Sequence, residues 1–153
     1  MEKMYIVLMS TNTKMGSFIR TFTRYKYNHI AISFDKELND MYSFARYKHA
    51  SSLVGGFVKE GKYRYIKNPP LFKFYEMPYS DYIKNTINKM EKEKEKYIYN
   101  TYSAITYVFG KNIKIKNSFT CFEFINQFLT ENYKSIKEFD LKNNNHIFEG
   151  NLE

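Results

Sequence analysis

The first half of the chain alternates between strand-like and helix-like patterns of apolar residues. Residues 4–9 form a short apolar run before a polar segment, which is typical of a buried strand that ends in a loop. Apolar residues at helical spacing from Met15 to Phe22 predict an amphipathic helix. Further strands are expected where short segments alternate or lie between turn residues: 29–34, 41–46, 57–59 and 71–77. The polar turn at 35–40 joins the first two of these into a hairpin.

The second half is predicted to be mainly helical. Three helices are expected from caps and helical spacing: one that follows Ser80 and continues to Tyr97, one at 99–109 that stops at Gly110, and one at 120–132. Ile113 and Ile115 predict a short edge segment between lysines, and the end of the chain reads as a loop with a brief apolar return at 147–148. This order of elements predicts an α+β fold with a mostly antiparallel sheet.

The composition fits a single globular domain over residues 1–153. Apolar residues make up 43% and charged residues 26%, which excludes a disordered or fibrous chain. No linker rich in Gly, Ser or Pro divides the sequence. Cys121 is the single cysteine, so the chain can form neither a disulfide framework nor a cysteine-rich zinc site. No metal or organic cofactor is expected.

The net charge of +8 raises the question of a nucleic-acid partner. The lysines are dispersed, however, and no RNA-binding motif or zinc-finger spacing accompanies them, so we expect no specific nucleic-acid partner. The apolar run at 5–9 is too short for a secretion signal, and no run approaches the roughly 20 residues of a membrane span. We therefore expect a cytoplasmic protein without a transmembrane segment.

The sequence around Cys121 predicts a helix N-terminus. Thr120 and Glu123 form a T-x-x-E capping box, in which Thr120 is the N-cap and Cys121 the first helical residue. The unpaired backbone N–H groups and the helix dipole at such a position favour a thiolate. Free cysteines are also among the most buried residues of proteins, so this spacing alone leaves Cys121 as either a nucleophile or a small structural residue.

A nucleophilic thiol needs a base, and the chain offers three histidines. His29 opens the apolar strand at 29–34, and a strand holds a base more rigidly than a loop does. His49 and His146 lie in predicted loops. His29 is therefore the preferred base, with a structural role at the edge of the sheet as the alternative.

These two residues together resemble a known family. His29 opens a His-Ile-Ala-Ile strand, a hairpin follows, and Cys121 stands at a helix start far downstream. This arrangement resembles the circularly permuted branch of the NlpC-type papain-like superfamily, which includes YiiX-like and YycO-like bacterial proteins and relatives of lecithin:retinol acyltransferase. The segment Cys-Phe-Glu-Phe-Ile that begins at Cys121 is similar to the helix start common in that branch. The resemblance extends from about Met4 to Leu129.

The resemblance implies a papain-like fold, in which a small antiparallel sheet packs against the cysteine helix and the thiol faces the histidine strand. It also implies a third polar residue on the next strand, which orients the imidazole. Ser43 occupies that place in the predicted hairpin, although its hydroxyl is shorter than the usual His, Glu, Asn or Gln side chain and carries no charge. Glu60 and Tyr42 are the alternatives, but Glu60 beside Gly61 is expected to be an exposed loop carboxylate.

The function implied by the resemblance is that of a cysteine hydrolase or acyltransferase acting on an amide, peptide or ester bond. Cys121 would be the nucleophile, His29 the general base and Ser43 the third polar residue. A small peptide, an amide or an acyl lipid could serve as substrate, and nothing in the sequence selects among them. The alternative is a weakly active or inactive member that uses the same groove to bind peptides or acyl lipids.

Overall fold

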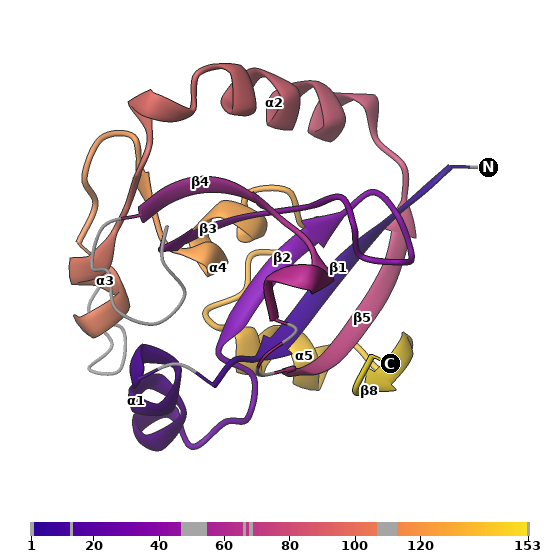
Figure 1. Cartoon of the computed structure of the whole chain (residues 1–153), viewed down its shortest axis with the longest axis vertical. Coiled ribbons are helices and arrows are strands. Elements are labelled where there is room, and N and C mark those ends of the chain that lie inside the picture. The colour runs from indigo at the N-terminus through magenta and orange to yellow at the C-terminus, as the bar shows by residue number, and fades with distance from the viewer. Residues whose placement is uncertain are drawn as a thin grey trace.

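The described part of the chain forms a six-stranded antiparallel sheet with the order β4–β3–β2–β1–β5–β8 (Figure 1). The computed structural model describes residues 2–12, 14–46, 55–65, 67, 69–106 and 113–152. The strands of the sheet are β1 (Lys3–Ser10), β2 (His29–Ser33), β3 (Met41–Arg46), β4 (Gly55–Glu60), β5 (Leu71–Pro78) and β8 (His146–Gly150). The α+β class and the antiparallel sheet predicted from the sequence are confirmed.

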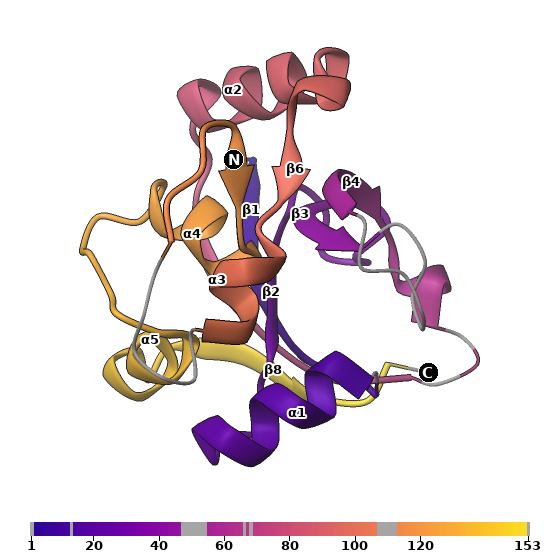
Figure 2. The ribbon, with the colours of Figure 1, turned by 90° about the vertical axis from the view of Figure 1, so that its left-hand side faces the viewer.

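Helices and two short strands complete the fold. They are α1 (Lys14–Thr23), η1 (Lys62–Tyr65), α2 (Asp81–Lys92), η2 (Lys94–Lys96), β6 (Ile98–Tyr99), α3 (Thr101–Thr106), β7 (Ser118–Phe119), α4 (Cys121–Asn126) and α5 (Ile136–Lys142). β6 and β7 pair in parallel as a separate two-stranded sheet. Figure 2 shows α4 and α5 on the same side of the strands, with α2 above them in that view.

Both faces of the central strand β1 are buried, which explains its continuous apolar sequence. The even-numbered residues from Met4 to Leu8 point into the core that α2, α4 and α5 cover. The odd-numbered residues from Tyr5 to Met9 point to the other face, where they pack with β5 and with Tyr65 of η1. The sheet therefore separates two apolar clusters.

β2 and β3 separate toward the end of their hairpin that lies away from the turn. The register between these two strands covers Ile32–Tyr42 and Ser33–Met41, next to the turn. Beyond that point β3 stays paired with β4 and β2 stays paired with β1. α4 contacts both β2 and β3, and Figure 1 shows it at the gap between them.

The helix predicted after Ser80 begins as expected but ends earlier. Ser80 is the N-cap of α2, and its Oγ accepts a hydrogen bond from the Ile83 N–H at 3.4 Å. The helix ends at Lys92, and the separate turn η2 leads to Tyr97, whose ring packs against Phe44. The helical spacing of Tyr97 was therefore misleading, because this residue reaches the core from an extended segment.

The helix predicted at 99–109 begins two residues late, because the strand β6 comes first. The Asn100 side chain caps α3 by accepting a hydrogen bond from the Ser103 N–H at 3.0 Å. The predicted end of this helix at Gly110 lies outside the described residues. Ile113 and Ile115 form no strand, and the next residues along the chain pair with β6 as β7 instead.

The single helix predicted at 120–132 is replaced by two helices, α4 and α5, which a turn separates. α4 ends at Asn126, whose side-chain amide bonds to both the N–H and the carbonyl of Tyr133 at 3.1 Å. α5 then begins after Ser135, whose Oγ accepts a hydrogen bond from the Glu138 N–H at 3.1 Å. This S-x-x-E box is the same signal that marks the start of α4, so α5 could have been predicted.

Phe44 lies at the centre of the aromatic core, so a substitution there tests how much this core stabilises the fold. Its side chain is fully buried, and its ring contacts four others at centroid distances of 5.1 to 6.2 Å: Phe57, Tyr97, Phe119 and Phe124. Phe44→Ala should lower the free energy of unfolding by about 3–5 kcal/mol, because lost burial and a residual cavity add. Urea unfolding gives this value. Leu141→Ala, at an exposed position of α5, should change it by about 0.5 kcal/mol or less, and equal losses in both variants would contradict this core.

Candidate active site

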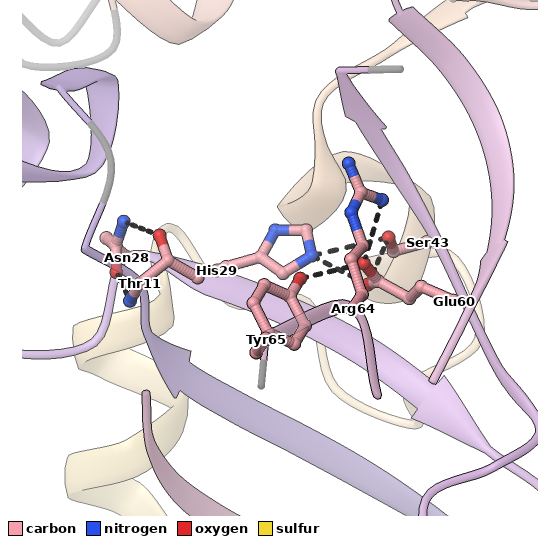
Figure 3. A network of polar contacts seen from close by, with 7 residues as sticks. All are labelled: Thr11, Asn28, His29, Ser43, Glu60, Arg64 and Tyr65. Atoms are coloured by element: carbon pink, nitrogen blue, oxygen red, sulfur yellow. Dashed lines mark hydrogen bonds and ion pairs between the residues drawn. The ribbon is translucent and has the colours of Figure 1, made fainter. Parts of the chain in front are cut away.

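His29 is fixed at the start of β2 by hydrogen bonds to the end of β1. It pairs with Met9 in the sheet, and the preceding N–H, that of Asn28, donates to the Met9 carbonyl at 3.0 Å. The Asn28 side chain accepts from the Thr11 N–H and donates to Thr11 Oγ1, each at 2.7 Å (Figure 3). The imidazole is thus held on a rigid strand, with 12% of its side chain exposed.

The Glu60 carboxylate is buried and accepts hydrogen bonds at both oxygens (Figure 3). Oε1 lies 2.9 Å from His29 Nε2 and 2.7 Å from Ser43 Oγ. Oε2 lies 2.8 Å from the Tyr65 hydroxyl and 3.2 Å from Arg64 Nη1. β4 ends at Glu60, and η1 then turns the chain so that Arg64 and Tyr65 reach the carboxylate. Such partners are what a carboxylate removed from water requires.

The structure corrects the prediction that Glu60 is an exposed loop carboxylate. Glu60 is 1% exposed and lies opposite Met41 in the β3–β4 register, so it shares a face of the sheet with Ser43. Ser43, the predicted third residue, is also buried, and its Oγ lies 3.3 Å from His29 Nε2. Its shorter contact is with Glu60. Glu60 is therefore the charged partner of the imidazole, and Ser43 bridges the two.

Tyr42, the other alternative for the third position, points away from this group. Its side chain belongs to the opposite apolar cluster, and its hydroxyl lies 3.5 Å from Glu91. His49 lies outside the described residues, and His146 is an exposed residue of β8. Of the histidines that the structure describes, His29 is the one beside Cys121 and Glu60.

Cys121 is the first residue of α4, and the predicted capping box is present. Thr120 Oγ1 accepts a hydrogen bond from the Glu123 N–H at 3.2 Å, and the Glu123 carboxylate bonds back to Thr120. Burial raises the pKa of Glu123, although its bonds to Thr120 act in the opposite direction. The helix is anchored by Phe124 and Ile125, which are fully buried, and the Cys121 residue is 7% exposed.

The Cys121 side chain lies close enough to the His29 ring to raise the pKa of the imidazole. Figure 3 shows His29 Nε2 turned toward Glu60 and Ser43, so these two residues do not engage Nδ1, the other nitrogen of the ring. Burial disfavours the charged form of His29, but the Glu60 carboxylate and then Cys121 outweigh it and raise the pKa of His29 to about 10. Burial opposes the charge of Glu60 as well, yet His29 and then Arg64 lower its pKa to about 2. An imidazolium–carboxylate pair is thus the stable state near neutral pH.

The thiol and the imidazole come from opposite faces of the sheet. Ile30 and Ile32 of β2 belong to the cluster that contains Cys121, whereas Ala31 belongs to the other cluster. Since side chains alternate along a strand, His29 shares the face of Ala31. The contact with Cys121 is possible because β2 and β3 have separated at this point. The opening in the sheet is therefore part of the site.

Neither a similar known protein nor, among the described residues, a metal site indicates the role of this group of side chains. Comparisons with protein-family models, with curated proteins and with solved structures gave no match. Among the described residues, no three His, Cys, Asp or Glu side chains gather as a metal site. The helices of the described ranges include none whose length and apolar character would let it cross a membrane.

The ion pair predicts how stability varies with pH. The pKa of Glu60 falls from 4.5 to about 2, so its contribution is present above pH 4.5 and is lost as the pH falls toward 2. The pKa of His29 rises from 6.5 to about 10, so its contribution is present below pH 6.5 and is lost as the pH rises toward 10. Both contributions coexist between pH 4.5 and 6.5, where we expect the highest urea midpoint.

Histidine variants separate this effect from other titrations. His29→Gln should flatten the decline in the urea midpoint between pH 6.5 and 10, because the group that loses its proton is gone. His146→Gln changes an exposed histidine of β8 and should keep the wild-type profile. If His29→Gln left the alkaline decline as steep as in the wild type, the ion pair would not be its cause.

Proposed function

We propose that this chain is a cysteine-dependent hydrolase or acyltransferase with the permuted papain-like arrangement that its sequence resembles. The observation that carries the proposal is the position of His29 between Cys121 and Glu60. Its ring lies near a thiol at a helix start, and its Nε2 faces a buried carboxylate. Nucleophile, proton carrier and orienting group in this order form the triad that thiol acyl transfer uses.

In the proposed mechanism, the thiol proton resides on His29, and a Cys121 thiolate attacks the substrate carbonyl. The C–S bond forms as the carbonyl π electrons move to oxygen. The imidazolium then donates its proton to the leaving amine or alcohol, which departs and leaves a thioacyl-enzyme. Neutral His29 next takes a proton from water or from an acceptor that attacks the thioester, and the thiolate is released. The Cys121 backbone N–H would contribute to oxyanion stabilisation.

In this scheme Glu60 has the orienting role that the sequence suggested for Ser43. A charged carboxylate on Nε2 stabilises the imidazolium, which a serine hydroxyl does only weakly. Arg64 and Tyr65 hold the second oxygen of Glu60, so the carboxylate cannot rotate toward the thiol. The proposed roles are therefore nucleophile for Cys121, proton carrier for His29, and positioning residue for Glu60 with support from Ser43.

A second candidate function is a binding module with little catalytic activity. A cleft of about 960 Å³ lies along the outer side of α4, and Phe119, Thr120 and Phe122 contribute to its wall. The Cys121 residue itself is only 7% exposed. This combination would suit a protein that binds a peptide or an acyl chain without cleaving it. Reactivity of the thiol separates the two candidates.

Alkylation by iodoacetamide tests the proposed thiol–imidazole pair, and the single cysteine makes the signal unambiguous. Near pH 7 the native protein should be modified at Cys121 at least about tenfold faster than His29→Ala, because the variant cannot accept the thiol proton. His146→Ala is the matched control and should react like the wild type. Mass spectrometry of quenched samples gives the rates. Equal rates in the wild type and His29→Ala, or modification only after unfolding, would favour the binding module.

NMR of the histidine rings tests the role of Glu60 separately from folding. Because Glu60 raises the pKa of His29 to about 10, the wild-type ring should remain protonated through pH 8. In Glu60→Gln its midpoint should fall toward the ordinary value of about 6.5, since the compensating charge is lost while the side chain keeps its size. Ser43→Ala should move the midpoint much less. A larger shift in Ser43→Ala than in Glu60→Gln would return the orienting role to Ser43.

A further inference from the structure

Three exposed isoleucines lie on two neighbouring segments, β6 and residues 113–117. Ile98 is 50% exposed, Ile113 44% and Ile115 40%. The two segments are joined, because the Ile98 N–H donates to the Asn117 carbonyl at 3.0 Å and Ile98 pairs with Ser118 in the small sheet. Single exposed apolar residues are ordinary, whereas a group of them marks a surface that binds something.

This group is held rigidly. Ile113 is fixed at its carbonyl by the Asn100 side chain at 2.5 Å, and at its N–H and carbonyl by Ser103 Oγ at 2.9 Å. Asn100 and Ser103 are themselves buried. Ile115 is tied through its carbonyl to the Ser118 N–H at 3.1 Å. The exposure of these isoleucines is therefore a property of the folded protein.

Lysines alternate with the isoleucines. The exposed segment 113–117 reads Ile-Lys-Ile-Lys-Asn and contains no acidic residue. Lys94 and Lys96 of η2 stand shortly before Ile98 in the sequence. Glu95 lies between these two lysines, and Glu93 pairs with Lys96 at 3.2 Å. Lys114 is also near Glu123 of α4. We call Ile98, Ile113, Ile115, Lys114 and Lys116 the isoleucine–lysine surface.

The composition of this surface favours one kind of partner. Cores of protein–protein interfaces are depleted in lysine and enriched in aromatic residues, whereas this surface combines aliphatic side chains with lysine. Nucleic acids would use the lysines but would leave the isoleucines in water. An interface of anionic headgroups and acyl chains satisfies both, because lysines contact the headgroups while apolar side chains enter the boundary below.

We propose that the isoleucine–lysine surface docks the protein onto an anionic lipid membrane. Lys114 and Ile115 also line the cleft along α4, together with Phe119, Thr120 and Phe122. A membrane bound at this surface therefore lies beside the cleft and beside α4, the helix that begins with Cys121. Docking itself does not depend on the proposed chemistry.

Sedimentation with vesicles tests the docking. The wild-type protein should bind vesicles of phosphatidylcholine mixed with phosphatidylglycerol, and should bind much less to phosphatidylcholine alone. The triple variant Ile98→Asn, Ile113→Asn, Ile115→Asn should lose at least about tenfold in affinity for the mixed vesicles. Lys114→Gln with Lys116→Gln should lose about five- to twentyfold and show a weaker dependence on salt.

The matched control changes two exposed apolar residues elsewhere, Leu141→Asn with Ile147→Asn, which should bind like the wild type. Thermal melting of each variant verifies that it is folded. The proposal is overturned by absence of vesicle binding, by equal binding to neutral vesicles, or by equal losses in the control. It is also overturned if the lysine variant loses affinity while the isoleucine variant does not, since that result indicates a polyanion such as nucleic acid. Cys121→Ser should bind vesicles like the wild type, so failure of the thiol chemistry would leave this result unchanged.

Discussion

Burial of the Glu60 carboxylate is the constraint from which the geometry of the site follows. A carboxylate without partners at this depth would cost several kcal/mol, so the fold must supply hydrogen-bond donors from every direction. His29, Ser43, Arg64 and Tyr65 are those donors, and they come from β2, β3 and η1. Three features together bring these groups to one carboxylate: the end of β4, the turn of η1 and the separation of β2 from β3.

The separation of β2 from β3 has a second consequence, because it lets a residue of the helical layer reach a side chain on the far face. α4 must approach closely for this contact, and its position depends on aromatic packing. Phe124 lies 5.2 Å from Phe44 and 5.8 Å from Phe57 between ring centroids, so α4 is held against β3 and β4. Thr120 then fixes where the helix begins. The position of the thiol thus depends on the core beneath it as much as on the imidazole beside it.

Local signals in the sequence were sufficient to place Cys121 at a helix start and His29 at a strand start, but not to predict the burial of Glu60. The capping box and the apolar strand are patterns of a few neighbouring residues, and the structure contains both. Glu60 stands before Gly61 in a segment that looks like an exposed turn, and its burial depends on pairing with Met41 across the sheet. Such a register is set by distant residues, which single-sequence patterns do not record. Ser43 was predicted from its place in the hairpin, and it does lie beside His29, but the residue that it supports could not be inferred.

The order of charges in the site also explains why a buried carboxylate need not oppose a thiolate. Glu60 presents Oε1 to His29, while Arg64 and Tyr65 occupy Oε2. Because Arg64 compensates part of the carboxylate charge, the imidazolium is not wholly neutralised by Glu60 and retains attraction for a negative sulfur near the ring. In the charge state that the proposed mechanism requires, thiolate, imidazolium, carboxylate and guanidinium alternate in sign. In the proposed mechanism, Arg64 thereby acts on the thiol through two intervening residues, without touching it.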